Sequence, residues 1–144
     1  MRSLREPTRA KAGMTFDEML EKIRYEGAYP TRERAETVTH AVLSGLGRQL
    51  TGDERAGLAA RLPAEAAHIL AAQAPAPAPL TGWEFVKDLA ARTDGTPATA
   101  RWDTGTVLTT VAHLAGPDLL DRIIARLPSG YALLFGRAEL LQAA

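Results

Sequence analysis

The chain has 144 residues, with 17 basic and 17 acidic side chains, three histidines and no cysteine. The length suits one ordinary domain, and a formal net charge of +0 excludes a global field that would hold nucleic acid or an acidic membrane surface. Without cysteine there are no disulfides, thiolate metal sites or cysteine nucleophiles, and no apolar run approaches the roughly 18 residues of a membrane span, so we expect a soluble, cytoplasmic protein.

The first 13 residues carry a local excess of basic charge. Arg2, Arg5, Arg9 and Lys11 are opposed by Glu6 alone. We predict a disordered basic N-terminal tail over residues 1–13. Weak binding of nucleic acid through this tail is one alternative function, although the balanced charge of the whole chain argues against it.

Residues 14–70 have the pattern of about four helices. In MTFDEMLEKI, Thr15 and Glu18 have the spacing of a capping box, in which each side chain bonds the backbone amide of the other residue. Thr51 and Glu54 have the same spacing at the predicted start of the third helix. The second helix carries an apolar stripe at spacings of three and four: Ala35, Val38, Val42 and Leu46.

Residues 71–80 contain the sequence APAPAP, which favours extended chain and predicts a Pro/Ala linker. The helical pattern then starts again over residues 81–136, with Thr81 and Glu84 as a capping box. We predict a C-terminal tail or helix extension over residues 137–144. The second helix of this half carries its own apolar stripe: Ala100, Val107, Leu108 and Val111.

One short stretch occurs twice. ARLPAEAAHILA begins at residue 60, and ARLPSGYALLFG begins 65 residues later. In each copy a leucine that faces the predicted core precedes a proline that ends the third helix: Leu62 with Pro63, and Leu127 with Pro128.

No segment has the two-residue alternation of a strand. We therefore predict an all-α fold in which two tandem helical repeats of about four helices each pack into one bundle-like domain over residues 14–136. Repeat 1 covers residues 14–70 and repeat 2 covers residues 81–136.

These motifs resemble those of a known family. The stretches TFDEML, AVLSGLGRQLTGDERAGLAARLP, GWEFV and RLPSGYALLFG are similar to the bacterial domain-of-unknown-function family 2267, and the resemblance covers residues 14–136. It implies an all-helical domain of two related halves and no established activity, cofactor or catalytic residue. Members sometimes occur in genomic company with stress-related proteins, which implies a stress-associated role.

Glu65 and His68 have the Glu-x-x-His spacing of di-iron helical bundles. Such a centre needs a second copy of the motif and two more carboxylates. The second half has Gly130 and Leu133 at the corresponding positions, so a complete site is not encoded twice. We interpret Glu65 and His68 as an exposed helical pair.

Glu36 and His40 are four residues apart on the second predicted helix, a spacing that suits a proton relay or half of a metal site. Gly105 stands at the position of His40 in the second half, which therefore offers no partner. No serine lies in a Gly-x-Ser-x-Gly motif. We predict no catalytic, cofactor-binding or metal-binding residue and no bound cofactor.

Six side chains are candidate interaction or structural positions. The two arginines among them each precede Leu-Pro, where they can cap carbonyls at a helix C-terminus or pair with a carboxylate of the other half. The aromatic residues suit core or interface anchors, and Trp83, Trp102 and Tyr131 can alternatively form a stacking platform. The six are Arg61, Arg126, Trp83, Trp102, Tyr131 and Phe135.

The leading functional hypothesis is a non-catalytic interaction or scaffold protein that holds a partner protein or a second copy in its helix grooves. The packing residues occur at corresponding positions of both halves, whereas the polar candidates for a catalytic site are scattered and have no counterpart in the other half. This pattern favours a structural role over a catalytic one. The rival hypothesis is a small-ligand or metal-binding enzyme that uses Glu65 with His68, or Glu36 with His40.

Overall fold

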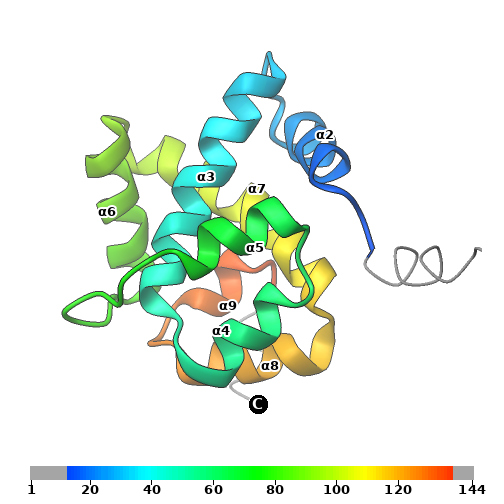
Figure 1. Ribbon diagram of the computed structural model, residues 1–144. Helices are drawn as coiled ribbons and strands as arrows, with labels where there is room; N and C mark the ends of the chain where they lie inside the picture. Colours follow the sequence, from blue (N-terminus) through cyan, green and yellow to red (C-terminus); the bar gives the residue numbers. More distant parts are fainter. Residues whose placement is uncertain (1–12, 138–144) are drawn as a thin grey trace, which may run out of the picture.

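The computed structural model describes residues 13–137, and within them eight helices and no strand. The predicted tails at residues 1–13 and 137–144 lie outside this part, apart from Gly13 and Arg137. The all-α fold class is confirmed (Figure 1). None of the eight helices combines the length and apolar character that crossing a bilayer requires. The helices are α2 (Phe16–Gly27), α3 (Arg32–Gln49), α4 (Gly52–Ala59), α5 (Ala64–Ala71), α6 (Gly82–Thr93), α7 (Pro97–Ala115), α8 (Pro117–Arg126) and α9 (Tyr131–Leu134).

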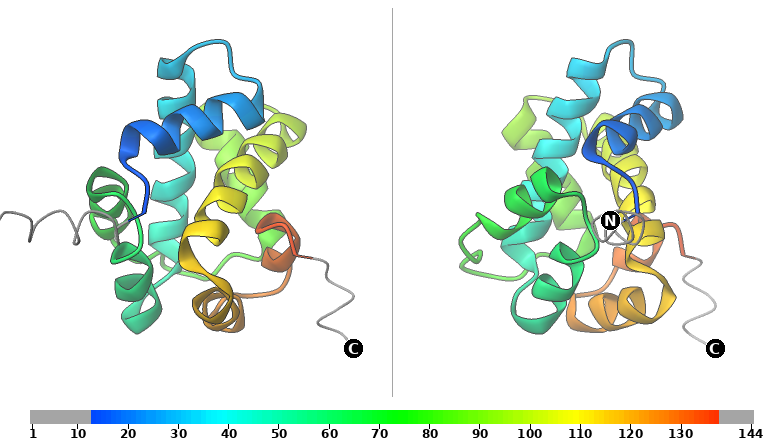
Figure 2. Two further views of the ribbon diagram at one scale, coloured as in Figure 1. Left: turned by 90° about the vertical axis from the view of Figure 1, so that its right-hand side faces the viewer. Right: turned by 45° about the vertical axis from the view of Figure 1, so that its right-hand side comes forward.

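The two longest helices, α3 and α7, pack against each other at the centre. Helix α2 lies across both of them, as Figure 2 shows, and α6 also contacts both. Helix α5 packs on α3, α9 packs on α7, and α4 contacts α8. The internal duplication itself stays a prediction. The central side chains Leu43, Leu46, Val107, Leu108 and Val111 are fully buried.

Capping fixes where two of the helices begin. At α2 the amide of Glu18 donates to the Thr15 hydroxyl at 3.1 Å, and the amide of Thr15 donates to the Glu18 carboxylate at 2.9 Å. Thr81 and Glu84 form the same pair of bonds at the start of α6, at 3.2 and 2.9 Å. Both predicted capping boxes are confirmed. Their hydrogen bonds join residues only three apart, so the local sequence is enough to predict them.

The third predicted capping box is wrong. Thr51 is the N-cap of α4, but its side chain accepts no capping hydrogen bond. The first helical residue, Gly52, has a φ of +69°, so the chain enters α4 in a different direction from the entry at Thr15. The carboxylate of Glu54 instead accepts from Nε of Arg126 on α8 at 3.0 Å.

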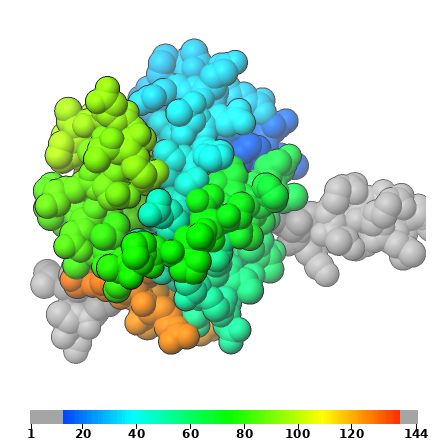
Figure 3. All heavy atoms as spheres, turned by 60° about the vertical axis from the view of Figure 1, so that its left-hand side comes forward, coloured from blue at the N-terminus to red at the C-terminus, as the bar shows by residue number. Residues whose placement is uncertain are grey.

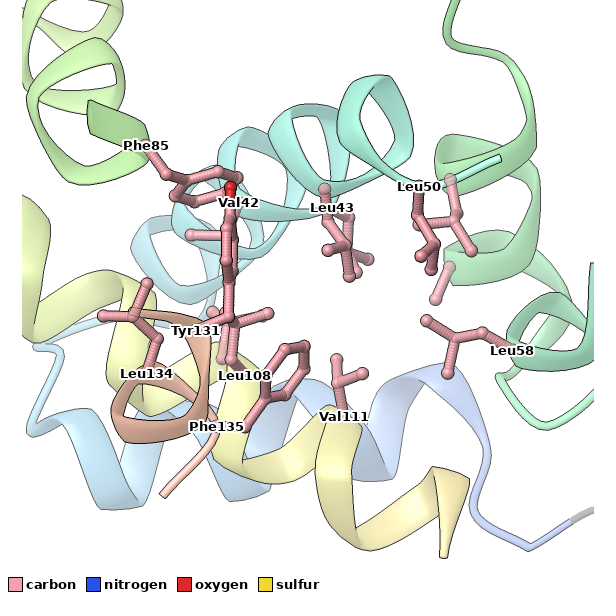
Figure 4. Packing of buried hydrophobic residues seen from close by; sticks show 14 of the residues in the cluster. Val42, Leu43, Leu50, Leu58, Phe85, Leu108, Val111, Tyr131, Leu134 and Phe135 are labelled. Atoms are coloured by element: carbon pink, nitrogen blue, oxygen red, sulfur yellow. The ribbon is translucent and has the colours of Figure 1, made fainter. Parts of the chain in front are cut away.

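The second ARLP stretch leads into a close backbone contact with the start of α6. Gly130 contacts Gly82 closely, and the Gly82 amide donates to the Ser129 carbonyl at 2.8 Å. The Tyr131 hydroxyl donates to the Leu80 carbonyl at 2.9 Å. Tyr131 also meets the ring of Phe85 edge to face, with centroids 5.8 Å apart (Figure 4). Helix α9 is thereby held against the start of α6 and the end of the linker.

The Gly82→Ala substitution is expected to lower the free energy of unfolding by about 1–3 kcal/mol. A Cβ at this position would lie 2.6 Å from the carbonyl carbon and oxygen of Gly130, which are backbone atoms and cannot rotate away. Urea unfolding followed by circular dichroism measures the loss.

Gly57→Ala is the matched control. The nearest atom to its Cβ would be a terminal carbon of the Leu119 side chain at 3.4 Å. Because alanine forms helix better than glycine, we expect unchanged stability or a gain of up to about 1 kcal/mol. Equal stability of the two variants would contradict the proposed contact at Gly82.

Candidate functional site

A groove of about 670 Å³ runs between α3 and α6. Figure 3 shows the face of the molecule on which α6 and α3 meet. The Thr31 hydroxyl caps α3 by accepting from the Arg34 amide at 3.1 Å, and the polar residues that follow at helical spacing line one wall. The lining residues are Glu33, Glu36, Thr37, His40, Ala41 and Ser44 of α3, with Arg92 and Thr93 of α6.

Glu36, His40 and Ser44 follow one another at intervals of one helical turn along this groove. Nδ1 of His40 lies 3.3 Å from Oγ of Ser44. A serine beside a histidine is the minimal arrangement for activating a hydroxyl, but the histidine also needs a group that orients it. Glu36 makes no hydrogen bond to His40 in the described structure, and both side chains are exposed. Sequence analysis paired Glu36 with His40 and missed Ser44, although its four-residue spacing from His40 is visible in the sequence.

A smaller cavity of about 260 Å³ adjoins the groove, and Thr37, Ala41, Arg92 and Thr93 line both. Its apolar lining comes from buried residues of α3 and α6, and its third wall comes from Asp103 of α7. The remaining lining residues are Arg34, Val38, Val42 and Leu89.

Asp103 is a carboxylate inside the protein. It is 9% exposed, and its Oδ1 accepts from the hydroxyl of Tyr29, itself 8% exposed, at 2.6 Å. Burial, followed by the hydrogen bond to Asp103 and its negative charge, raises the pKa of Tyr29 well above its usual range. Tyr29 therefore stays protonated and keeps its hydrogen available to the carboxylate.

Asp103 is not among the candidates predicted above, although the sequence carries a signal for it. It interrupts the apolar stripe of the second half, and it stands 65 residues after Val38, the buried member of the first stripe. Charged side chains are rarely buried without a partner, so a carboxylate at a core position marks a special environment.

A second surface groove, of about 350 Å³, lies on α7 and α9. Trp102 and Leu133 line it and are 55% and 52% exposed. The indole Nε1 of Trp102 donates to the carbonyl of Gly27 at 3.0 Å, which fixes the ring against the end of α2. The other lining residues are Glu26, Arg101, Gly105, Thr106, Thr109, Leu134 and Gly136.

One protein family has a sequence model that matches this chain. The model of the family described as "Uncharacterized conserved protein (DUF2267)" matches residues 16–134, which is the whole extent of helices α2 to α9. The chain belongs to this family. No curated protein matches the DUF2267 chain.

In this DUF2267 chain both arginines of the repeated motif reach the other half. Arg61 donates to the carbonyl of Ala115, at the C-terminal end of α7, at 2.9 Å. Arg126 donates to Glu54 on α4 at 3.0 Å. The Arg126 hydrogen bond is the chief cause that lowers the pKa of the Glu54 carboxyl. Both contacts connect the two halves, and neither arginine lines the α3–α6 groove or the α7–α9 groove.

The aromatic candidates divide into buried and exposed residues. Tyr131 and Phe135 are 1% and 2% exposed and belong to the core (Figure 4). Trp83 is 56% exposed, with Nζ of Lys87 5.9 Å from its ring centroid. Because Tyr131 is buried, it cannot form an exposed stacking platform with Trp83 and Trp102.

Glu65 and His68 are exposed on α5. Within residues 13–137, no three histidine, aspartate or glutamate side chains gather closely enough to hold a metal ion. The Glu-x-x-His spacing therefore lacks the additional ligands that a di-iron centre needs in this part of the DUF2267 chain.

Tyr29→Phe is expected to lower the free energy of unfolding by about 1–3 kcal/mol, because the buried Asp103 carboxylate loses its hydrogen-bond donor. Tyr25→Phe is the matched control. Tyr25 is 80% exposed, and its loss should change stability by less than about 0.5 kcal/mol. Urea unfolding at neutral pH measures the stability of both variants. Equal stabilities would show that the hydrogen bond between Tyr29 and Asp103 contributes nothing.

The free energy of unfolding is also expected to fall as the pH rises above about 10. Burial, as the leading cause, raises the pKa of both Tyr29 and Tyr131 in the folded protein. Their protonated state is therefore stabilised fully below the unfolded pKa, and this stabilisation is lost as the pH rises toward the folded pKa. Unfolding at about pH 8 and about pH 11 measures the fall, which should be smaller in Tyr29→Phe. An identical fall in the variant would remove Tyr29 as a cause.

Proposed function

We propose that the chain is a non-catalytic cytoplasmic interaction protein whose α7–α9 groove binds an apolar side chain of a partner protein. The observation that carries the proposal is the position of Trp102 and Leu133. Both line this groove and expose more than half of their surface. Large apolar side chains exposed together at a concave site are typical of protein interfaces.

The groove has further properties of an interface. Trp102 is already held by its hydrogen bond to Gly27, so little side-chain freedom is lost on binding. Arg101 and Glu26 place opposite charges beside the apolar residues, as in the polar rim that surrounds the apolar centre of an interface. A second copy of the chain is the alternative partner.

Binding of a small ligand is the second candidate function, and the α3–α6 groove favours it. Glu36 and His40 both line this groove, together with Ser44 and Arg92. A metal-dependent version has less support, because within the described residues these groups are not joined by a third histidine or carboxylate at metal-binding distance.

Affinity purification of the tagged full-length chain from its native host, with quantification of the retained proteins, tests the interaction proposal. Trp102→Ala and Leu133→Ser are each expected to reduce a specific retained protein by about tenfold or more, as for side chains at the centre of an interface. Circular dichroism checks that each variant is folded. Light scattering of the purified chain measures self-association.

Trp83→Ala provides the matched control, because Trp83 is equally exposed but lies on α6, outside the α7–α9 groove. Its retained proteins should equal those of the unaltered chain. If all three variants retain the same proteins and the same oligomeric state, the α7–α9 groove is not an interface.

A further inference from the structure

We propose that the cavity between α3, α6 and α7 binds a small zwitterion of the aliphatic α-amino acid class. This site is separate from the α7–α9 groove and uses none of its lining residues. The inference depends on three kinds of lining group that meet in one cavity of about 260 Å³: a carboxylate, two guanidinium groups and an aliphatic wall.

The carboxylate is the binding group for the ligand ammonium. Tyr29 donates only to Oδ1 of Asp103. Within the described residues, Asp103 has no ion-pair partner and no donor to Oδ2. Asp103 is 9% exposed, and its Oδ2 can accept a charge-assisted hydrogen bond from an ammonium in the cavity.

The two threonines of the cavity also favour a donor. The Thr37 hydroxyl donates to the carbonyl of Glu33 at 3.0 Å, and the Thr93 hydroxyl donates to the carbonyl of Leu89 at 2.8 Å. Each hydroxyl hydrogen is thereby used, so each oxygen meets a ligand as an acceptor. An ammonium carries three donors and no acceptor, which matches these oxygens and Asp103.

The guanidinium groups are the binding groups for the ligand carboxylate. Arg34 and Arg92 line the cavity from α3 and α6. Arg92 bonds Asp88 through Nε at 2.9 Å and places Nη2 beside Gly45 of α3, which leaves Nη1 for a ligand. Two guanidinium groups offer several N–H donors to a carboxylate, a geometry that lysine does not provide.

The aliphatic lining and the volume of the cavity determine which ligand side chain fits. Val38, Val42 and Leu89 are buried and present only hydrocarbon to the cavity. The volume is just below the lower limit of about 300 Å³ for sites of drug-sized ligands, so it suits a small metabolite. An amino acid with an aliphatic side chain satisfies all three kinds of lining group at once.

Isothermal titration of the full-length chain with L-leucine tests the proposal, with 3-methylbutylamine and 4-methylpentanoate as probes that each lack one charged group. Leucine is expected to bind and to raise the melting temperature. Each of the two probes should bind at least about tenfold more weakly, because one charged hydrogen-bonded contact is lost. A failure of leucine to bind at millimolar concentration overturns the proposal, and so does equal binding of either probe.

Two variants assign the binding to this cavity. Asp103→Asn keeps an oxygen for Tyr29 but removes the charge, and Arg34→Gln changes an exposed residue that is not part of the core. Each should weaken leucine binding about tenfold or more. Arg101→Gln, on α7 but lining the other groove, is the matched control and should bind as the unaltered chain does. Leucine binding that is unchanged in Arg34→Gln places the ligand elsewhere and contradicts the proposal, even if Asp103→Asn does not fold.

Discussion

The contact between α3 and α7 is the constraint on which the described structure depends. Helices α2 and α6 each contact both long helices, so the positions of α3 and α7 determine where the α3–α6 and α7–α9 grooves form. A glycine on α3 also determines how closely α6 can approach it. A Cβ on Gly45 of α3 would lie 3.0 Å from the Phe85 ring, so glycine allows α6 to pack close to α3 beside the α3–α6 groove.

The Tyr29–Asp103 pair connects this framework to the candidate ligand site. Tyr29 follows the end of α2, Asp103 lies on α7, and the cavity wall beside Asp103 is formed by α3 and α6. Four helices thus meet around one buried carboxylate. Tyrosine donates to one oxygen of this carboxylate, and the other is the oxygen to which the ligand ammonium of the proposal would donate.

The sequence predicted most of what is local and little of what depends on distant contacts. Helix starts at Thr15 and Thr81 follow from residues three apart, and the apolar stripes identify the core faces. The box at Thr51 does not form, since Gly52 enters α4 with a φ of +69° and the Glu54 carboxylate accepts from Arg126, a residue 72 positions away. Composition also could not separate the two tryptophans, which are exposed, from Tyr131, which is buried against Phe85.

The two surface grooves occupy matching positions, and this correspondence separates the proposed roles. Five residues that line the α3–α6 groove are each followed, 65 positions later, by a residue that lines the α7–α9 groove. Where the first groove has threonine and histidine, the second has tryptophan and glycine, so one is polar and the other has an apolar edge. If the halves are repeats, the two grooves have diverged in the character of their lining, and each lining suits the role proposed for it above. The pairs are Glu36 with Arg101, Thr37 with Trp102, His40 with Gly105, Ala41 with Thr106, and Ser44 with Thr109.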